Sequence, residues 1–389
     1  MEDFQIKEKE IIVCDRDFIL RNLKLIPSEQ SESEDFLKLE TDWAVDRAES
    51  EHSRIIAVEN PEELFEYFDG IKTIKPDRVS RPKGDTTFFT SAGVQHIETI
   101  FRETGKLERE SFVVAQPVIR SQFMDRVKEG TSTSFVNFSV GHIDSTPEEF
   151  LASCKALIKL IHGRGGDSKN LRFKVENTPD QWGRRKFTKT VFTVYVNSIE
   201  VGECVYMHDY PVVDDQKVNI TDVGLGVERL NFALEPGGHF FPEFGVFYEK
   251  AGEDDVVGLI DCVRTAVLIA REDIQPSNHD AGYRLRQLSR RFVSRNKNHG
   301  FDMVELVHIA YKYWEKWGSP ATVGEEDVAR IIQTENDRNY NALLLTLLKQ
   351  EGESVYIEIN QPTDKFLKQL RVSLPKSKTL IDKIIGKLE

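Results

Sequence analysis

The pattern of apolar and polar positions divides the chain into a strand-rich part and a helical part. Strands are predicted where β-branched and aromatic residues alternate with polar ones, at 112–120, 135–140, 171–176, 187–196 and 199–207. Asn197 and Ser198 stand between the last two runs and predict a hairpin turn. Weaker strand character is found at 10–20, 86–94 and 354–359.

Helices are predicted where apolar residues recur at helical spacing, at 61–68, 95–104, 147–162, 256–267, 282–296, 302–317 and 325–349. The third of these has the clearest start, because Thr146 is followed three residues later by Glu149 in a capping box. The segment 28–35 is rich in Ser and Glu and is predicted to be a loop. The aromatic stripe of Tyr311, Trp314 and Trp317 is expected to pack within a helical core.

This order of elements predicts an α+β fold, in which a mostly antiparallel sheet flanked by helices is followed by a helical domain. We expect an N-terminal extension at 1–58 whose sequence indicates no chemistry, a strand-rich domain at 59–248 and a helical domain at 249–389.

Composition narrows the class of protein. The 389 residues carry a net charge of −13, which favours solubility and argues against a protein that coats polyanions over its whole surface. The four cysteines lie far apart and form no CxxC pair, so a zinc knuckle and a disulfide framework are both disfavoured. No apolar run approaches the ~20 residues of a membrane span, and the acidic start is not a signal peptide. A cytoplasmic protein with no membrane segment is therefore expected.

The segment 220–230, which reads ITDVGLGVERL, is the most informative part of the chain. Gly224 and Gly226 allow a sharp turn and a close approach to a ligand, and Glu228 and Arg229 follow at a helix start that favours anions. Such a pattern is also common wherever a strand leads into a helix. A second candidate is Arg120, at the end of an apolar strand, which either grips a phosphate with its planar guanidinium or forms a surface salt bridge.

Several ordered segments together resemble the alanyl-tRNA synthetase family of class II synthetases. The first is FTSAGVQ at 89–95, similar to the family's FTNAGMNQ, and the second is 116–120, with Arg120 on the motif 2 arginine. NFSVG at 137–141 and IEVGECVYM at 199–207 resemble two further strands, and DVGLGVER at 222–229 resembles motif 3. PSNHDAGYRLRQLSRR at 276–291 is similar to the start of the family's tRNA-binding helical domain.

The resemblance implies a class II catalytic sheet that binds ATP with Mg²⁺ and forms an aminoacyl-adenylate. Arg120 would hold the α-phosphate and the amino-acid carboxylate, and Arg229 the γ-phosphate or the adenine side. Both would stabilise charge that develops on the phosphate, so the two are expected to meet at one nucleotide pocket. The remaining implied ATP contacts are Phe135, Gly224, Gly226 and Glu228.

The resemblance also implies a site for a small amino acid such as alanine. Asp222 would accept hydrogen bonds from the substrate ammonium, and Val205 would line the side-chain pocket. Glu203 stands where the family has asparagine, which puts the identity of the amino acid in question. Trp182 is either a substrate lid or a packed aromatic residue. The motif 2 glutamate is replaced by Thr133 or Val136, depending on the register.

The segment 284–297 carries six basic residues and no acidic one. On a helix, Leu285, Leu288 and Phe292 form an apolar stripe with basic residues on both flanks, which suits a phosphate backbone. The alternative is a solvated helix whose arginines pair with this protein's many acids. Asn278 falls on the asparagine with which the family reads the tRNA acceptor stem, or else belongs to a capping turn. The expected tRNA contacts are Asn278, Arg284, Arg286, Arg290, Arg291 and Arg295.

The sequence therefore predicts an AMP-forming ligase that activates a small amino acid and passes it to tRNA. Two alternatives stay open at this point. One is an adenylate-forming ligase that delivers the acyl group to an amine or a carrier thiol, and the other is a catalytically silent tRNA-binding relative.

Overall fold

The computed structural model describes residues 14–28, 36–40, 57–83, 85, 87–124, 126–127, 130–212 and 216–388. The chain forms two compact units that alternate along the sequence. Unit 1 comprises Met1–Lys75, Ala92–Gln116 and Val136–Gly238, and unit 2 comprises Pro76–Ser91, Pro117–Phe135 and His239–Glu389. Two segments from the N-terminal half thus belong to the same unit as the C-terminal helices, an interleaving that the predicted division at 58 and 248 does not contain.

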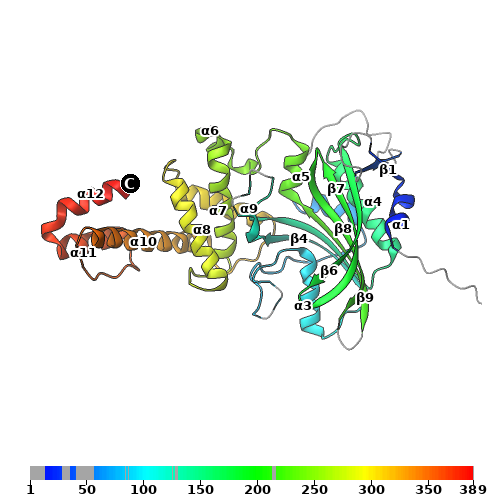
Figure 1. Cartoon of the computed structure of the whole chain (residues 1–389), viewed down its shortest axis with the longest axis horizontal. Helices are drawn as coiled ribbons and strands as arrows, with labels where there is room; N and C mark the ends of the chain where they lie inside the picture. Colours follow the sequence, from blue (N-terminus) through cyan, green and yellow to red (C-terminus); the bar gives the residue numbers. More distant parts are fainter. Residues whose placement is uncertain are drawn as a thin grey trace, which may run out of the picture. The chain divides into compact units, whose positions relative to one another are not determined.

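The fold is mixed α+β, and its main sheet has nine strands in the order β1-β2-β6-β7-β8-β9-β5-β4-β3. Pairing is mostly antiparallel, and β3 and β4 are parallel. The strands are β1 Leu25–Pro27, β2 Leu37–Leu39, β3 Lys72–Thr73, β4 Glu110–Ile119, β5 Ser134–Ile143, β6 Leu171–Trp182, β7 Arg185–Val196, β8 Ile199–Pro211 and β9 Lys217–Gly226 (Figure 1). The predicted strands at 112–120, 135–140, 171–176, 187–196 and 199–207 are confirmed.

The predicted hairpin between β7 and β8 is also confirmed. Asn197 and Ser198 both have positive φ, 49° and 68°. This backbone matches the twist of two adjoining strands in a two-residue turn. The turn sets the register in which Val191 faces Val205 farther along the hairpin.

Unit 1 covers the sheet with short helices, which are α1 Arg16–Leu23, α2 Glu62–Phe65, η1 Glu66–Phe68, η2 Gly93–Gln95, α3 His96–Thr104, α4 Pro147–Gly163 and α5 Val227–Leu234. The capping box predicted for α4 is present, since Thr146 accepts from the Glu149 N–H and Glu149 from the Thr146 N–H. α4 packs on β8 and β9. Its Phe150 ring meets the Tyr206 ring edge to face, with centroids 5.6 Å apart, within the range of about 4.5–7 Å that is typical of aromatic pairs.

Unit 2 is mainly helical. Its elements are η3 Ser121–Phe123, η5 Pro242–Phe244, α6 Gly245–Ala251, α7 Glu253–Ala270, α8 Asp280–Asn296, α9 Met303–Lys316, α10 Glu325–Gln350, α11 Thr363–Ser373, η6 Pro375–Ser377 and α12 Lys378–Leu388. α7 packs against α8, α9 and α10, and the C-terminal part of α10 forms a separate apolar cluster with α11 and α12 (Figure 1). Tyr311, Trp314 and Trp317 are buried, so the prediction of a packed aromatic stripe is confirmed.

Three predicted strands are wrong in whole or in part. Within 10–20, residues 16–20 form the start of α1, because Asp15 accepts a hydrogen bond from the Phe18 N–H and caps a helix. In 86–94, only an isolated bridge between Ser80 and Phe89 forms. The segment 354–359 has no partner strand among the described residues, and the Asn341 side chain donates to the Ile359 carbonyl instead. The predicted loop at 28–35 lies outside the described residues after Ser28.

Candidate functional site

One face of the sheet in unit 1 gathers the residues expected to bind an amino acid. Asp222 of β9 lies directly opposite Val205 of β8, and Gly224 lies opposite Glu203. Directly opposed residues on antiparallel strands point to the same face, so these four share one surface. Ser139 of β5 faces Gly224 from the other side, and its hydroxyl donates to Asp222 over 3.2 Å.

An apolar surface adjoins these carboxylates. Val205 is buried in a core cluster with Val191 and Met207, against which Ile100 and Phe101 of α3 also pack. Val205 therefore lies at the border of the apolar core, and the carboxylate of Asp222 lies next to it. A ligand that combines an ammonium with a small apolar side chain matches this juxtaposition, since the charge needs a partner and the side chain needs burial.

The glycines of the motif at 220–230 do not make the sharp turn that was expected. Gly224 and Gly226 lie in β9 and neither has positive φ, so the strand runs into α5 without a left-handed turn. A close approach between strand backbones occurs at Gly202 of β8, where a Cβ atom would lie 2.7 Å from the carbonyl oxygen of Gly224. The expected sharp turn is therefore wrong, and glycine is needed here because two strand backbones pack closely.

The two charged residues at the start of α5 make contacts within unit 1. Glu228 is buried, and its carboxylate accepts a hydrogen bond from the Val136 N–H over 2.9 Å. The guanidinium of Arg229 donates to the Glu200 carbonyl over 3.2 Å. Both side chains thus connect α5 to neighbouring strands. Arg229 is half-buried, and one of its guanidinium nitrogens contacts a backbone oxygen.

The register places Trp182 far along its strand from the amino-acid residues, although its ring packs against the same apolar cluster as Val205. Glu176 of β6 faces Val191, which faces Val205, which faces Asp222. Trp182 lies six residues farther along β6, which corresponds to about 20 Å at the rise of a strand. Its ring packs on Tyr210, with centroids 5.7 Å apart. Trp182 thus has the environment of a packed aromatic residue.

Arg120 follows β4 in unit 2, and several contacts hold it. Its Nε donates to the Ser91 carbonyl over 2.9 Å, and its backbone N–H donates to the Thr133 carbonyl over 2.8 Å. The guanidinium carbon lies 5.1 Å from the centroid of the Phe135 ring. Arg120 and Phe135, both expected at the ATP site, are therefore neighbours.

A buried carboxylate supports this arrangement. Asp261 of α7 accepts from the backbone N–H of Thr133 over 2.8 Å and from its hydroxyl over 2.5 Å. Burial raises the pKa of Asp261 to about 6, although both hydrogen bonds from Thr133 act in the opposite direction. Thr133, which replaces a family glutamate in one register, thus anchors the segment after Arg120 to α7. Arg120 belongs to unit 2 and Arg229 to unit 1, and their convergence on one nucleotide stays a prediction.

The basic helix α8 has the predicted apolar stripe, with Leu285, Leu288 and Phe292 all buried. On one flank, Nε of Arg286 and Nε of Arg290 lie 2.8 Å and 3.0 Å from the same carboxylate oxygen of Glu335 on α10. Arg338 adds a third guanidinium, 3.1 Å from the second oxygen. Glu335 is only 2% exposed. For Arg286 and Arg290, the structure therefore shows the predicted alternative in which the arginines pair with acids.

The other basic residues have varied surroundings. Arg295 donates to the Gly258 carbonyl of α7 over 2.6 Å and lies 3.1 Å from the Cys262 sulfur, so it packs between helices. Arg284 donates to Gln287, and Arg291 is half-buried. Asn278 accepts a short hydrogen bond from Arg286 and borders an open cavity of about 450 Å³. Asn278 and Arg286 thus form one polar surface.

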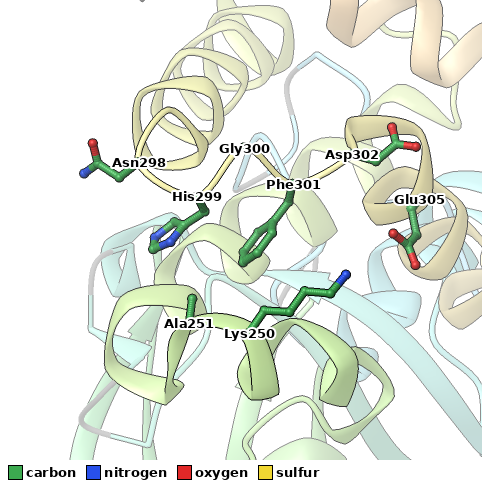
Figure 2. Close-up of a pocket in the computed structure, with 8 residues that line it drawn as sticks. All are labelled: Lys250, Ala251, Asn298, His299, Gly300, Phe301, Asp302 and Glu305. Atoms are coloured by element: carbon green, nitrogen blue, oxygen red, sulfur yellow. The ribbon is translucent and has the colours of Figure 1, made fainter.

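A second cavity of unit 2, of about 390 Å³, lies where α6 meets the loop between α8 and α9 (Figure 2). The His299 ring stacks on Phe301, with centroids 5.1 Å apart. Lys250 lies on one side, and the carboxylates of Asp302 and Glu305 lie on the other. Since both signs of charge line this cavity, it does not favour a phosphate.

Three supporting residues escaped sequence reasoning. Asp261 and Glu335 are single acids in helices, and only the packing of α7 and α10 shows which groups they hold. Thr193 of β7 faces Glu203 and is buried on the same sheet face as Asp222. No local spacing in the sequence relates these residues to their partners. The alternation within β7 could have placed Thr193 beside Val191 on this face.

Other features of the described residues bear on cofactors and surroundings. No group of three or more His, Cys, Asp or Glu side chains in these ranges is placed to hold a metal ion. None of the helices seen here is both long and apolar enough to cross a membrane. The four cysteines are free and buried, and burial raises the pKa of Cys14 to about 12.

Comparison with known proteins gives one distant similarity. No family model matches the chain. A stretch of 170 residues is 28% identical to the alanine–tRNA ligase of Geobacillus thermodenitrificans (strain NG80-2). The similarity covers 38% of this chain and 18% of that protein, so the chain corresponds to less than a fifth of the length of this relative.

Proposed function

We propose that this chain activates a small amino acid with ATP as an aminoacyl-adenylate and transfers the aminoacyl group to tRNA. The observation that carries the proposal is the sheet face on which Asp222 adjoins the apolar side chain of Val205. The similarity to an alanine–tRNA ligase and the large antiparallel sheet support it. In this proposal the sheet is a class II synthetase sheet.

The amino acid is bound by its charge and by its size. Asp222 accepts hydrogen bonds from the substrate ammonium, and Val205 contacts a small side chain. Glu203 lies two residues from Val205 on the same face of β8, where its carboxylate accepts one further donor. A substrate with an extra hydrogen-bond donor is therefore favoured over alanine if Glu203 is charged in the complex. A branched or longer side chain is disfavoured, because Val205 belongs to a closely packed core.

ATP is held mainly by charge and stacking. Arg120 binds the α-phosphate and the substrate carboxylate, Arg229 binds the γ-phosphate, and Phe135 stacks on the adenine. No protein nucleophile is required, because the substrate carboxylate attacks the α-phosphate and pyrophosphate leaves. Mg²⁺ enters with ATP and neutralises phosphate charge. We assign it no protein ligands, and no step of the proposal depends on them.

Transfer to tRNA rests on α8 and the loop that precedes it. Asn278 and Arg286 border one open cavity, next to Arg338 and Thr334. Arg284 and Arg291 lie elsewhere on the same helix. Phosphate contacts of this kind position a nucleic acid and do not read its sequence, so we propose that Asn278 supplies a contact to base edges of the acceptor stem.

Pyrophosphate exchange with each amino acid in turn tests activation. A charge-assisted hydrogen bond is worth about 1.5–3 kcal/mol, so Arg120→Ala and Arg229→Ala should each slow exchange by about 10- to 100-fold. Arg330→Ala is the matched control, since Arg330 is exposed on α10 and pairs with Asp327 in the preceding turn of the same helix. Exchange at the normal rate in both arginine variants would contradict the site assignment. Glu203→Asn should shift the preferred amino acid.

Binding of an acceptor-stem minihelix at low salt tests the acceptor. Arg284→Ala and Arg291→Ala should weaken binding and reduce its salt dependence by about one ion each. Exchange without minihelix binding would indicate a ligase that uses an amine or a carrier thiol. Minihelix binding without exchange for any amino acid would indicate a catalytically silent tRNA-binding protein.

A further inference from the structure

A surface pocket of unit 1 lies between α1 and α4, on the opposite side of α4 from its buried face. It has a volume of about 510 Å³ and is lined by Asn22, Lys24, Tyr67, Ala152, Lys155, Ala156 and Lys159. This volume is in the usual range for sites of small molecules. Three of the seven lining residues are lysines, in a chain whose net charge is −13.

The sequence of α4 builds one side of this pocket. Ala152, Lys155, Ala156 and Lys159 follow the spacing i, i+3, i+4, i+7 and therefore share one helix face. The alanines leave space between the two lysines, while Cys154, Leu157 and Ile158 are buried on the other face. Lys155 and Lys159 are four residues apart, and two like charges at this spacing destabilise a helix. The packing of α4 therefore does not explain why two lysines occur at this spacing.

Lys24 reaches the pocket from the end of α1 in an unusual backbone conformation. It is the C-terminal cap of α1, with φ 53° and ψ 55°, and its N–H donates to the Leu20 carbonyl. This left-handed position is the one at which glycine is strongly preferred, because a Cβ atom is disfavoured there. A lysine keeps its ammonium at the pocket at the expense of backbone strain.

The acids near this pocket are only partly paired. Arg164 binds Glu63 and Glu66, which precede Tyr67 in sequence, at 2.7 Å and 3.5 Å, whereas the backbone N–H of Glu40 donates to the Lys24 carbonyl. Among the residues that the structure describes, none forms a salt bridge with Lys24, Lys155 or Lys159. The three lysines therefore line one pocket without a salt-bridge partner among the described residues.

We propose that this pocket binds a small ligand with several phosphate charges, such as a polyphosphate or a multiply phosphorylated metabolite. Lysine ammonium groups act as point charges that suit phosphate oxygens arranged around a centre. The Asn22 side-chain amide donates to the Phe18 carbonyl, which leaves its oxygen directed away from that bond as an acceptor for a ligand hydroxyl. Ala152 and Ala156 form the floor of this open pocket between the two lysines of α4, and its volume suits a compact ligand better than an extended RNA backbone. The proposal does not depend on the proposed ligase activity.

Calorimetric titration of the full chain with sodium tripolyphosphate tests the proposal. The titration is done in the Arg229→Ala background, so that the proposed ATP site contributes less to the signal. Lys155→Ala with Lys159→Ala should weaken binding by about tenfold, because two partly exposed charge pairs are lost. Lys186→Ala is the matched control, since Lys186 is an exposed lysine of unit 1 outside the pocket, and it should leave binding unchanged.

Two single variants separate a built pocket from general attraction to a basic surface. Ala156→Leu keeps all three lysines and fills the floor, so a pocket loses its ligand and a diffuse surface does not. Lys24→Gly relieves the left-handed strain, so it should leave the melting temperature unchanged or raise it while affinity falls about fivefold. Wild-type affinity in the Ala156→Leu variant or in the double lysine variant overturns the proposal. It is equally overturned if the lysine variants lose affinity for an RNA hairpin and keep their affinity for tripolyphosphate.

Discussion

Replacement of Asp261 tests how the segment after Arg120 is held. The Asp261 carboxylate is 1% exposed and accepts both the N–H and the hydroxyl of Thr133. The Thr133 carbonyl in turn accepts the N–H of Arg120. Asp261→Ala leaves a buried backbone donor without an acceptor, which costs about 1–3 kcal/mol, and opens a small cavity besides. Asp261→Asn keeps the shape, because its oxygen accepts the Thr133 N–H and its amide donates to the Thr133 hydroxyl.

The pH dependence separates these variants further. Burial raises the pKa of Asp261 from 3.8 to about 6. The folded protein therefore holds a proton that the unfolded chain has lost between these two pH values. The stability that this carboxyl contributes is fully present below pH 3.8 and is lost as the pH rises through 6. Linkage gives a loss of about 2 kcal/mol between pH 4.5 and pH 7.5, and Asp261→Asn should lack it.

Urea unfolding of the wild type and both variants at pH 4.5 and pH 7.5 measures this. We expect the free energy of unfolding of Asp261→Asn, relative to the wild type, to rise by about 2 kcal/mol from the lower to the higher pH. Asp261→Ala should be less stable than Asp261→Asn at both. A constant difference between the wild type and Asp261→Asn would refute the buried, proton-linked carboxyl. Equal stability of the two variants would refute the hydrogen-bonding argument.

Three further predictions concern other parts of the fold. Glu335→Ala should lower the free energy of unfolding by about 1–3 kcal/mol in urea, because three partly exposed guanidinium groups lose the carboxylate that they share, and Glu335→Gln should lower it less. Gly202→Ala should lower it by about 1–3 kcal/mol, since its Cβ would lie 2.7 Å from a backbone oxygen. Gly224→Ala, with its nearest atom at 3.4 Å, should be much milder, and equal melting temperatures would contradict the packing argument. Burial lowers the pKa of His142, so stability should fall as the pH drops below about 6.5, where the unfolded chain takes up a proton. His142→Asn should flatten that fall in a series of thermal melts.

The strands and helices with strong local signals could be predicted from the sequence. The pair Asn197 and Ser198 located the hairpin, and Thr146 with Glu149 located the start of α4. Segments without such signals were not predictable. The chain at 354–359 alternates like a strand, but its apolar residues pack onto the α10–α12 cluster and no strand pairs with it. Alternation reports burial of every second residue, and a strand also needs a partner.

The residues of the sheet face that would bind an amino acid were partly predictable from the sequence. The residues that lie opposite them on neighbouring strands were not. The motif at 220–230 and the segment 199–207 contained Asp222 and Val205, which the register of β8 and β9 brings opposite each other. For Trp182, the candidate lid, the register gives a position about 20 Å along β6 from Glu176, the residue level with Asp222. A sequence gives the alternation of a strand but not its register with a neighbour, and a shift of register decides which residues meet.

The flank of α8 shows why a charge pattern alone does not decide between binding and packing. Helical spacing correctly placed Arg286 and Arg290 together, but the acid that they share comes from α10, 49 and 45 residues later. Three guanidinium groups, including that of Arg338, surround the single carboxylate of Glu335. This leaves two positive charges in excess, so the ion pairs fix the positions of the arginines without neutralising the flank. The same residues therefore serve the packing of α8 on α10 and retain the charge that a phosphate backbone requires.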